Sequence, residues 1–257
     1  MKGLVVDHDH AAHVRQSFER QVGLFSGDDS PFAKRSGELA WIEPLHEDMV
    51  VLDVACGAGH AAESVAPRVR EVVGIDLTRA LLDLGAQRLA ENGVRNVLLQ
   101  EGDAEDLQFV NGSFDLVFCR GSIHHFADPS RASDEMARVC CPGGRLVLVV
   151  LVPPDADVRD AFDQVHRLLD PSHVRSYLAE ELAELLPGGK GGLIYASALS
   201  LRLPVSVAMT EQSDAEAVER LLRDELDGGA RTGMLPLLED AALTVDFTTC
   251  ILHASHP

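Results

Sequence analysis

The sequence predicts an α/β fold with a doubly wound, mostly parallel sheet and helices on both of its faces, on three observations. Strand-like and helix-like segments alternate between residues 49 and 152, and such alternation is typical of a parallel sheet with crossover helices. A small-residue turn at 56–59 joins an apolar strand to an alanine-rich helix. Two long alternating runs, 193–209 and 243–255, predict an antiparallel pair at one edge of the sheet.

Within the alternating region, apolar runs mark the strands and amphipathic segments mark the helices. The expected strands are 49–55, 71–76, 96–103, 114–120 and 145–152. The expected helices are 60–69, 78–93 and 129–140. Turn residues separate these elements: Gly93 is expected to cap the second helix, Asn111 and Gly112 form a turn, and a glycine pair at 143–144 precedes the last strand.

The pattern changes after Pro153. Helices are expected at 155–169, 177–186 and 214–226, before and between the two long alternating runs. Gly-Gly pairs at 188–189 and 191–192 mark loops. Because the chain contains no internal repeat and no low-complexity tract, one large domain is expected after a leading segment of about fifty residues.

Composition excludes several classes of partner. The 257 residues include 41 acidic and 22 basic ones, and the formal net charge is −19. A nucleic-acid partner needs clustered lysine and arginine, which the chain lacks, so none is expected. The five cysteines form no CxxC pair, which predicts free thiols in a reducing compartment and neither disulfides nor a metal site. No apolar stretch reaches the length of a membrane span, and a cytoplasmic location is expected.

The glycine turn is typical of a nucleotide-like ligand site. Gly57 to Ala62 fits the pattern GxGxxA, in which glycine lets the backbone approach a ligand and the following helix offers unpaired N–H groups. Asp76 ends the second expected strand, where a carboxylate can accept hydrogen bonds from two ribose hydroxyls. These features fit both NAD and S-adenosylmethionine.

Three further features favour S-adenosylmethionine. The turn lies about fifty residues into the chain, later than is usual for a dinucleotide-binding domain. Asp53 precedes the turn, where it can receive the ammonium of an amino-acid-like ligand, and Asp103 can accept a hydrogen bond from an adenine amino group. A pyrophosphate prefers positive potential, so an acid-lined site suits a sulfonium and an ammonium better.

Six segments carry a resemblance to one family. They are VLDVACGAGH, VVGIDLT, GDAEDLQF, SFDLVFCRGSIHHFADP, CPGGRLVLV and LLDPSHVRSY, in this order between residues 49 and 177. Through them the chain resembles the class I S-adenosylmethionine-dependent methyltransferases of the ubiquinone/menaquinone-biosynthesis-like group. The resemblance implies a Rossmann-like, seven-stranded sheet whose C-terminal strand is antiparallel.

The resemblance also implies S-adenosyl-L-methionine as the cofactor and a set of contacts to it. The implied residues are Asp53, Gly57 and Gly59 at the methionine part, Asp76 at the ribose, Leu77, Asp103 and Ala104 at the adenine, and also Ala55 and Cys119. Residues 1–48 are expected to form a helical lid over the domain 49–257, and Phe18, Phe25 and Phe32 either cover the site from this lid or serve in simple packing. In that domain, 49–152 is the cofactor half and 153–257 the substrate side. Phe25 stands where many relatives have a tyrosine, and a phenylalanine cannot make the hydroxyl contact to the cofactor that the resemblance would imply at this position.

Three histidines are candidates for a general base. His124 and His125 follow the fourth expected strand, at the sheet edge that faces the ligand crevice, and imidazole titrates near neutral pH. Packing beneath a loop is the alternative for this pair. His173 is the other candidate, with a structural role in a helix-start turn as its alternative. A base is optional, because methyl transfer from a sulfonium is an in-line displacement that depends strongly on positioning.

The sequence therefore predicts an enzyme that transfers a methyl group from S-adenosylmethionine to a small, partly apolar metabolite, either quinone-like or a natural product. Two alternatives stay open. One is a protein of the same fold that binds the cofactor without transferring methyl, as a binding partner or a rearrangement enzyme. The other is an NAD-dependent oxidoreductase, although the chain has no Tyr-x-x-x-Lys set. The acceptor atom and the oligomeric state, a homodimer included, are left open.

Overall fold

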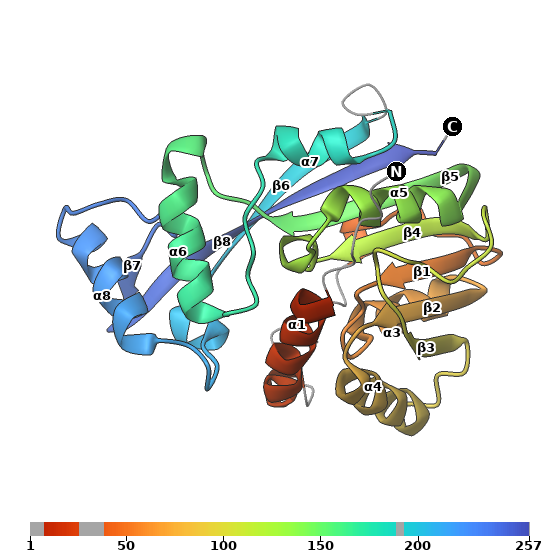
Figure 1. Ribbon diagram of the computed structural model, residues 1–257, viewed down its shortest axis with the longest axis horizontal. Coiled ribbons are helices and arrows are strands. Elements are labelled where there is room, and N and C mark those ends of the chain that lie inside the picture. The colour runs from red at the N-terminus through yellow and green to blue at the C-terminus, as the bar shows by residue number, and fades with distance from the viewer. Residues whose placement is uncertain (1–7, 26–38, 189–192, 257) are drawn as a thin grey trace.

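The computed structural model describes residues 8–25, 39–188 and 193–256 (Figure 1). In these ranges the strands form one eight-stranded sheet in the order β3-β2-β1-β4-β5-β8-β6, and β7 pairs with β8. The strands are β1 (Val50–Val54), β2 (Glu71–Asp76), β3 (Val97–Glu101), β4 (Phe114–Arg120), β5 (Cys140–Leu151), β6 (Leu193–Pro204), β7 (Leu237–Glu239) and β8 (Ala242–Ser255). β1 to β5 pair in parallel, whereas β8 runs antiparallel to β5, β6 and β7. The predicted doubly wound, mostly parallel sheet with an antiparallel pair at one edge is confirmed.

The sheet has one strand more than the seven expected. β7 pairs with the start of β8, and the two are joined through Asp240 and Ala241, which both have positive φ. Two consecutive residues with positive φ form a tight hairpin turn. The three residues of β7 are too few to show an alternating pattern, and Leu237 and Leu238 are exposed. Periodicity therefore does not mark this strand in the sequence.

Helices cover both faces of the sheet (Figure 1). The α-helices of the described residues are α1 (His8–Arg20), α3 (His60–Val65), α4 (Arg79–Glu91), α5 (Pro129–Val139), α6 (Arg159–Leu169), α7 (Ala179–Leu185) and α8 (Ala215–Leu226). Leu52 and Val117 pack in one hydrophobic cluster with α5 and α7, whereas their neighbours Val51 and Phe118 pack in another with α3. This burial on two sides explains why the strands are nearly continuous apolar runs. None of the described helices is long and apolar enough to cross a bilayer.

The C-terminal half builds a third hydrophobic cluster beyond the parallel strands. Phe162 and Val165 of α6 and Leu222 of α8 meet Val245 and Phe247 of β8 in this cluster. β8 has 14 residues, and Figure 1 shows it running from α6 and α8 to the edge of the main sheet. A cavity is therefore enclosed between the carboxyl ends of the parallel strands and the third cluster.

Helix α4 supports the glycine turn through a close contact at Gly85. A Cβ atom on Gly85 would overlap the carbonyl oxygen of Ala58 and lie 2.9 Å from its carbonyl carbon. Arg88, one turn further along α4, donates a hydrogen bond to the same oxygen at 2.6 Å. The backbone of the turn therefore lies directly against the helix, and only a residue without a side chain leaves room for it.

We expect Gly85→Ala to destabilise the protein, although alanine is favoured over glycine inside a helix by about 1 kcal/mol. The overlap with the turn displaces α4, and overpacking of this kind costs about 1–3 kcal/mol. Urea denaturation measures the free energy of unfolding. Gly23→Ala is the control, because its Cβ position has no atom within 4 Å. A Gly85→Ala protein more stable than wild type would contradict the close contact.

Candidate active site

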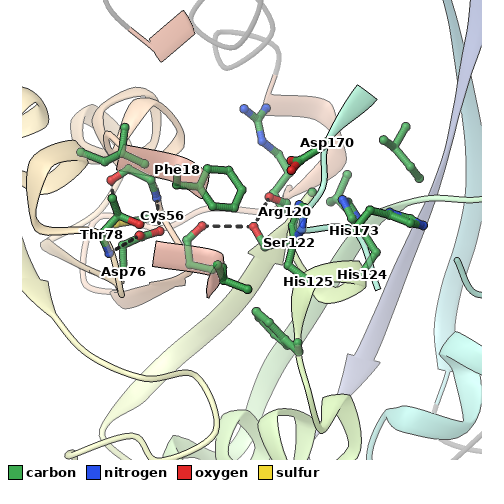
Figure 2. Close-up of a pocket in the computed structure, with 18 of the residues that line it drawn as sticks. Phe18, Cys56, Asp76, Thr78, Arg120, Ser122, His124, His125, Asp170 and His173 are labelled. Atoms are coloured by element: carbon green, nitrogen blue, oxygen red, sulfur yellow. Dashed lines mark hydrogen bonds between the residues drawn. The ribbon is translucent and has the colours of Figure 1, made fainter. Parts of the chain in front are cut away.

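A cavity of about 690 Å³ opens at the carboxyl ends of β1, β2 and β4. Open α/β sheets bind ligands at this position, and the volume lies in the range of small-molecule sites. Residues of α1, α6, β6 and β8 also line the cavity. Figure 2 shows Asp76 and Thr78 at one end and a group of histidines at the other, with Phe18 and Arg120 between them. These ends are called the acidic end and the histidine end below.

At the acidic end, two backbone N–H groups hold Asp76. Gly57 donates to its Oδ2 and Thr78 to its Oδ1, both at 2.8 Å. Gly57 has a φ of 55°, which glycine adopts without strain. Burial raises the pKa of Asp76, and the two backbone hydrogen bonds, together with one from the side chain of Thr78, act against that increase. The acceptor positions of the carboxylate that these donors do not use are available to a ligand.

Asp53 lies in β1 and lines the same end of the cavity. Its side chain is buried, and its Oδ2 has no hydrogen-bond partner among the described residues. Burial raises the pKa of Asp53 to about 8, while the charge of Arg120 opposes this increase and that of Asp76 adds to it. Buried polar atoms without partners are rare in folded proteins, so this oxygen indicates a place for a ligand donor.

Arg120 is the last residue of β4 and lines the cavity. Its guanidinium lies over the ring of Trp41, with 5.7 Å between Cζ and the ring centroid. Together with Asp53 it provides one cationic and one acidic group, which are complementary to the carboxylate and the ammonium of an amino acid. Arg120 is not among the cofactor contacts predicted from the sequence, although it stands at a strand end, as Asp76 does.

Four of the predicted cofactor contacts lie along the walls of the acidic end. Ala55, Leu77, Asp103 and Ala104 all line the cavity. Asp103 accepts a hydrogen bond from the N–H of Glu105 at 2.9 Å, which fixes the loop after β3. The structure therefore brings these residues together with Asp53, Gly57 and Asp76.

Two predicted contacts do not line the cavity. Gly59 begins α3 with a φ of 72°, and a Cβ there would meet Leu99 instead of the cavity. Cys119 is buried in the hydrophobic cluster that contains α5 and α7. It precedes Arg120 in β4, and successive strand residues point to opposite faces of a sheet. These positions give Gly59 a structural place in the turn and Cys119 a place in the core.

The histidine end of the cavity is lined by buried imidazole rings. His124 and His125 lie on a short 3-10 turn after β4, and His173 comes from the segment after α6. His166 of α6, which the sequence analysis did not select, joins them. The ring centroid of His173 is 5.3 Å from that of His124 and 5.2 Å from that of His166. Burial lowers the pKa of His124, His125 and His166, the last to about 4, so these rings are neutral at pH 7.

His173 is paired with a carboxylate. Its Nε2 lies 2.8 Å from Oδ1 of Asp163, and both side chains are buried. The N–H of Ser176 donates to the same oxygen at 2.7 Å. Although burial acts in the opposite direction, these hydrogen bonds hold the pKa of Asp163 below its ordinary value. Asp163 does not line the cavity, so it lies behind His173.

His125 is held from two sides. Its Nδ1 lies 3.1 Å from Oγ of Ser172, which donates a hydrogen bond to Asp170 at 2.7 Å. Its carbonyl oxygen lies 2.8 Å from Nε2 of His10 in α1. These contacts fix the loop after β4 against α1. In the ranges that the structure describes, no group of three His, Cys, Asp or Glu side chains is placed to hold a metal ion.

Helix α1 connects the two ends of the cavity. Arg15 donates to the carbonyl oxygen of Leu77 at 3.1 Å, and Ser17 donates to Asp170 at 3.3 Å. Phe18 meets the ring of His125 edge-on, with 5.1 Å between the centroids. Of the other two phenylalanines predicted for the lid, Phe25 lines the cavity, while Phe32 lies outside the described residues. The described part of this segment therefore contributes a wall to the site.

Comparisons with known proteins point to one family. A family profile described as a methyltransferase domain matches residues 52–148. The uncharacterized methyltransferase YcgJ of Bacillus subtilis is 38% identical over 156 residues, which are 60% of this chain and 61% of that protein. The uncharacterized protein YafE of Escherichia coli is 35% identical over 148 residues, 57% of this chain and 70% of that protein. A demethylmenaquinone methyltransferase of Deinococcus radiodurans is 35% identical over 162 residues, 62% of this chain and 63% of that protein.

These sequence matches cover less than two thirds of YcgJ and of the Deinococcus enzyme. The structural likeness extends further. The crystal structure of YcgJ superposes with a TM-score of 0.73 and 28% identity, covering 86% of this chain and 97% of that one. The likeness in fold to YcgJ therefore covers more of the chain than the likeness in sequence.

Proposed function

Because the chain belongs to the class I S-adenosylmethionine-dependent methyltransferases, we propose that it transfers the methyl group of S-adenosyl-L-methionine to a small, partly apolar metabolite. The observation that carries this proposal is the division of one cavity into two ends. The glycine turn and three acids line one end, which suits a cationic nucleoside. Apolar and imidazole side chains line the other end, which suits the acceptor.

The acidic end offers a partner for each polar part of the cofactor. When bound, S-adenosylmethionine supplies an activated methyl group on a sulfonium, open to in-line displacement. Asp76 accepts the two ribose hydroxyls with the acceptor positions that Gly57 and Thr78 leave free. Asp103 accepts the adenine amino group, and Leu77 and Ala104 pack against the ring.

Asp53 and Arg120 bind the methionine part. The unpartnered Oδ2 of Asp53 is the observation that supports this fit, because an ammonium there satisfies a buried acceptor. Arg120 binds the carboxylate from the other side. A dinucleotide offers neither group and brings a pyrophosphate against the acids, so this pair favours S-adenosylmethionine over NAD.

We expect Arg120→Met to weaken the binding of S-adenosylhomocysteine about tenfold and to leave 5′-methylthioadenosine, which has no amino-acid group, unaffected. The loss corresponds to one charge-assisted hydrogen bond to the ligand carboxylate. Titration calorimetry measures both affinities. Arg79→Met is the matched control, because Arg79 is exposed and pairs with Asp83. An equal loss for both ligands would contradict the assigned position of the carboxylate.

The acceptor lies at the histidine end of the cavity. Leu151, Leu203, Phe247 and Ile251 line the cavity from β5, β6 and β8, and they suit a flat, apolar molecule. The likeness to a protein named demethylmenaquinone methyltransferase supports a quinone-like acceptor, and a natural product of similar shape fits the same walls. Helix α1 acts as the lid over both ends of the cavity, through its contacts with Leu77 and Asp170.

The function is tested in two steps. Titration calorimetry with S-adenosylhomocysteine and NADH identifies the cofactor, and saturable binding of S-adenosylhomocysteine alone is expected. Mass spectrometry then follows the transfer of a deuterated methyl group from S-adenosylmethionine to a panel of hydroxynaphthoquinones, naphthols and phenols. NADH binding alone would overturn the proposal. Binding of S-adenosylhomocysteine with no labelled product across the panel would favour a protein of this fold that does not transfer methyl.

A further inference from the structure

Three histidines at the histidine end each have a buried ring nitrogen without a partner among the described residues. One of these atoms, Nε2 of His166, keeps a lone pair, because Nδ1 of that ring donates to the carbonyl oxygen of Phe162 at 3.0 Å. Nδ1 of His124 and Nδ1 of His173 make no hydrogen bond with the described residues. The two ring centroids are 5.3 Å apart and the ring planes are inclined by 39°, so the rings must turn toward each other before the two nitrogens reach hydrogen-bond distance. An N–H on one ring and a lone pair on the other would satisfy each other. The two unpartnered atoms therefore have a common explanation.

Asp163 determines which nitrogen of His173 carries the proton. Its carboxylate lies 2.8 Å from Nε2 and stays ionised at neutral pH, so Nε2 is the donor and Nδ1 keeps the lone pair. Asp163 lies behind the ring and outside the cavity. In this arrangement a carboxylate orients an imidazole and stabilises the imidazolium that forms when the ring takes a proton.

His124 is the member of the cluster that can reach the ligand. It lines the cavity. Among the described residues, its Nδ1 is a buried atom without a partner, whereas its Nε2 is not such an atom. Nε2 is therefore the atom that an acceptor can contact. His125 is less suited to move a proton, because its Nδ1 is engaged by Ser172.

We propose that His124, His173 and Asp163 form a proton-transfer chain and that the methyl acceptor is a phenol or an enol whose hydroxyl proton enters this chain. The inference rests on the proposed function, because it concerns the acceptor of that reaction. His124 is the catalytic residue, since it touches the acceptor. His173 and Asp163 are positioning residues that act through it.

The step balances without a further reactant. The hydroxyl O–H bond breaks and its proton binds Nε2 of His124, while the proton on Nδ1 of His124 passes to Nδ1 of His173. The imidazolium that forms is paired with the carboxylate of Asp163. The electron pair on the acceptor oxygen forms the bond to the methyl carbon as the carbon–sulfur bond breaks, and the sulfur keeps the electrons of that bond.

The surrounding charges place the transferred proton on His173. The titratable and charged groups around this ring are Asp163, His166 and Arg167 on α6, His124 and His125 after β4, and Asp170 on its own segment. Burial holds the pKa of His124 and of His166 low, so neither keeps a proton at pH 7. His173 has a buried carboxylate at hydrogen-bond distance, which makes it the site where a positive charge is balanced.

The test uses 4-nitrophenol and 4-nitro-1-naphthol as probes, because the visible absorption of each reports its ionisation. Each probe is titrated into the protein saturated with S-adenosylhomocysteine, at a pH below the pKa of the free phenol. We expect each probe to ionise when it binds, so that the absorption of its phenolate appears. Asp163→Asn should lower the bound phenolate fraction at least about tenfold, because an amide no longer fixes the tautomer or balances the charge. Asp160→Asn, at an exposed position of the same helix, is the matched control.

Each outcome decides the proposal. Equal phenolate absorption in wild type and Asp163→Asn would show that the chain takes no proton and would overturn it. Absence of saturable binding of either phenol to a protein that binds S-adenosylhomocysteine would overturn the acceptor class. Failure to bind S-adenosylhomocysteine would instead overturn the proposed function. Should Asp163→Asn fail to fold, ¹⁵N NMR of the wild-type protein saturated with S-adenosylhomocysteine decides. Without a phenol, a neutral His173 ring with its proton on Nε2 supports the chain, and a neutral ring with its proton on Nδ1 overturns it.

Discussion

Asp76→Asn is expected to lower the affinity for S-adenosylhomocysteine about 100-fold or more. The carboxylate of Asp76 accepts the N–H groups of Gly57 and Thr78 and, in the proposed complex, two ribose hydroxyls. An amide replaces one of its oxygens by an NH₂ group, which cannot accept from the backbone or from the ribose. Two charge-assisted hydrogen bonds are lost or weakened, at about 1.5–3 kcal/mol each. A total of about 3 kcal/mol corresponds to roughly 100-fold in affinity.

Titration calorimetry measures this loss, with Asp83→Asn as the control. Asp83 lies on α4, where its side chain is exposed and pairs with Arg79 at 2.8 Å, so its replacement should leave the affinity unchanged. Thermal unfolding of both variants separates loss of the ligand contact from loss of the turn. An Asp76→Asn protein that folds and binds S-adenosylhomocysteine as tightly as wild type would rule out the ribose contact.

The acidic end of the site could be predicted from the strand pattern. Asp53, Asp76 and Asp103 lie at or near the carboxyl ends of apolar runs, and parallel strands bring those ends to one edge of the sheet. The same rule also marks Arg120, at the end of the fourth strand. Cys119 shows how local the rule is, since one position along a strand changes the face to which a side chain points.

The histidine end could be predicted only in part. His124 and His125 follow a strand, but Asp163 and His166 lie inside α6, where polar residues are typical of an exposed face. Both are buried because the segment around His173 folds back along that helix. Such a contact depends on tertiary packing, so the spacing of residues in the sequence does not encode it.

Binding of S-adenosylhomocysteine at pH 7 is expected to release close to one proton from Asp53. Burial raises the pKa of this carboxyl to about 8, so about nine tenths of it is protonated at pH 7 in the absence of a ligand. An ammonium at its unpartnered Oδ2 favours the ionised form, and the proton leaves. Calorimetry in two buffers of different ionisation enthalpy measures the number of protons released. The number of protons released on binding should fall toward zero above pH 9, because Asp53 is already ionised there before the ligand binds.

Asp53→Asn should abolish the proton release and weaken binding about tenfold, because a neutral amide loses the ion pair with the ammonium. The raised pKa of Asp53 also determines how the stability of the ligand-free protein depends on pH. A carboxyl whose pKa is higher in the folded state than in the unfolded state stabilises the fold below pH 4, and this contribution is lost as the pH rises through about 8. The ligand-free Asp53→Asn protein, which stays uncharged, should therefore gain stability relative to wild type across that interval. If wild type and Asp53→Asn released equal numbers of protons on binding, the titrating group would be another one and the ammonium would not lie at Asp53.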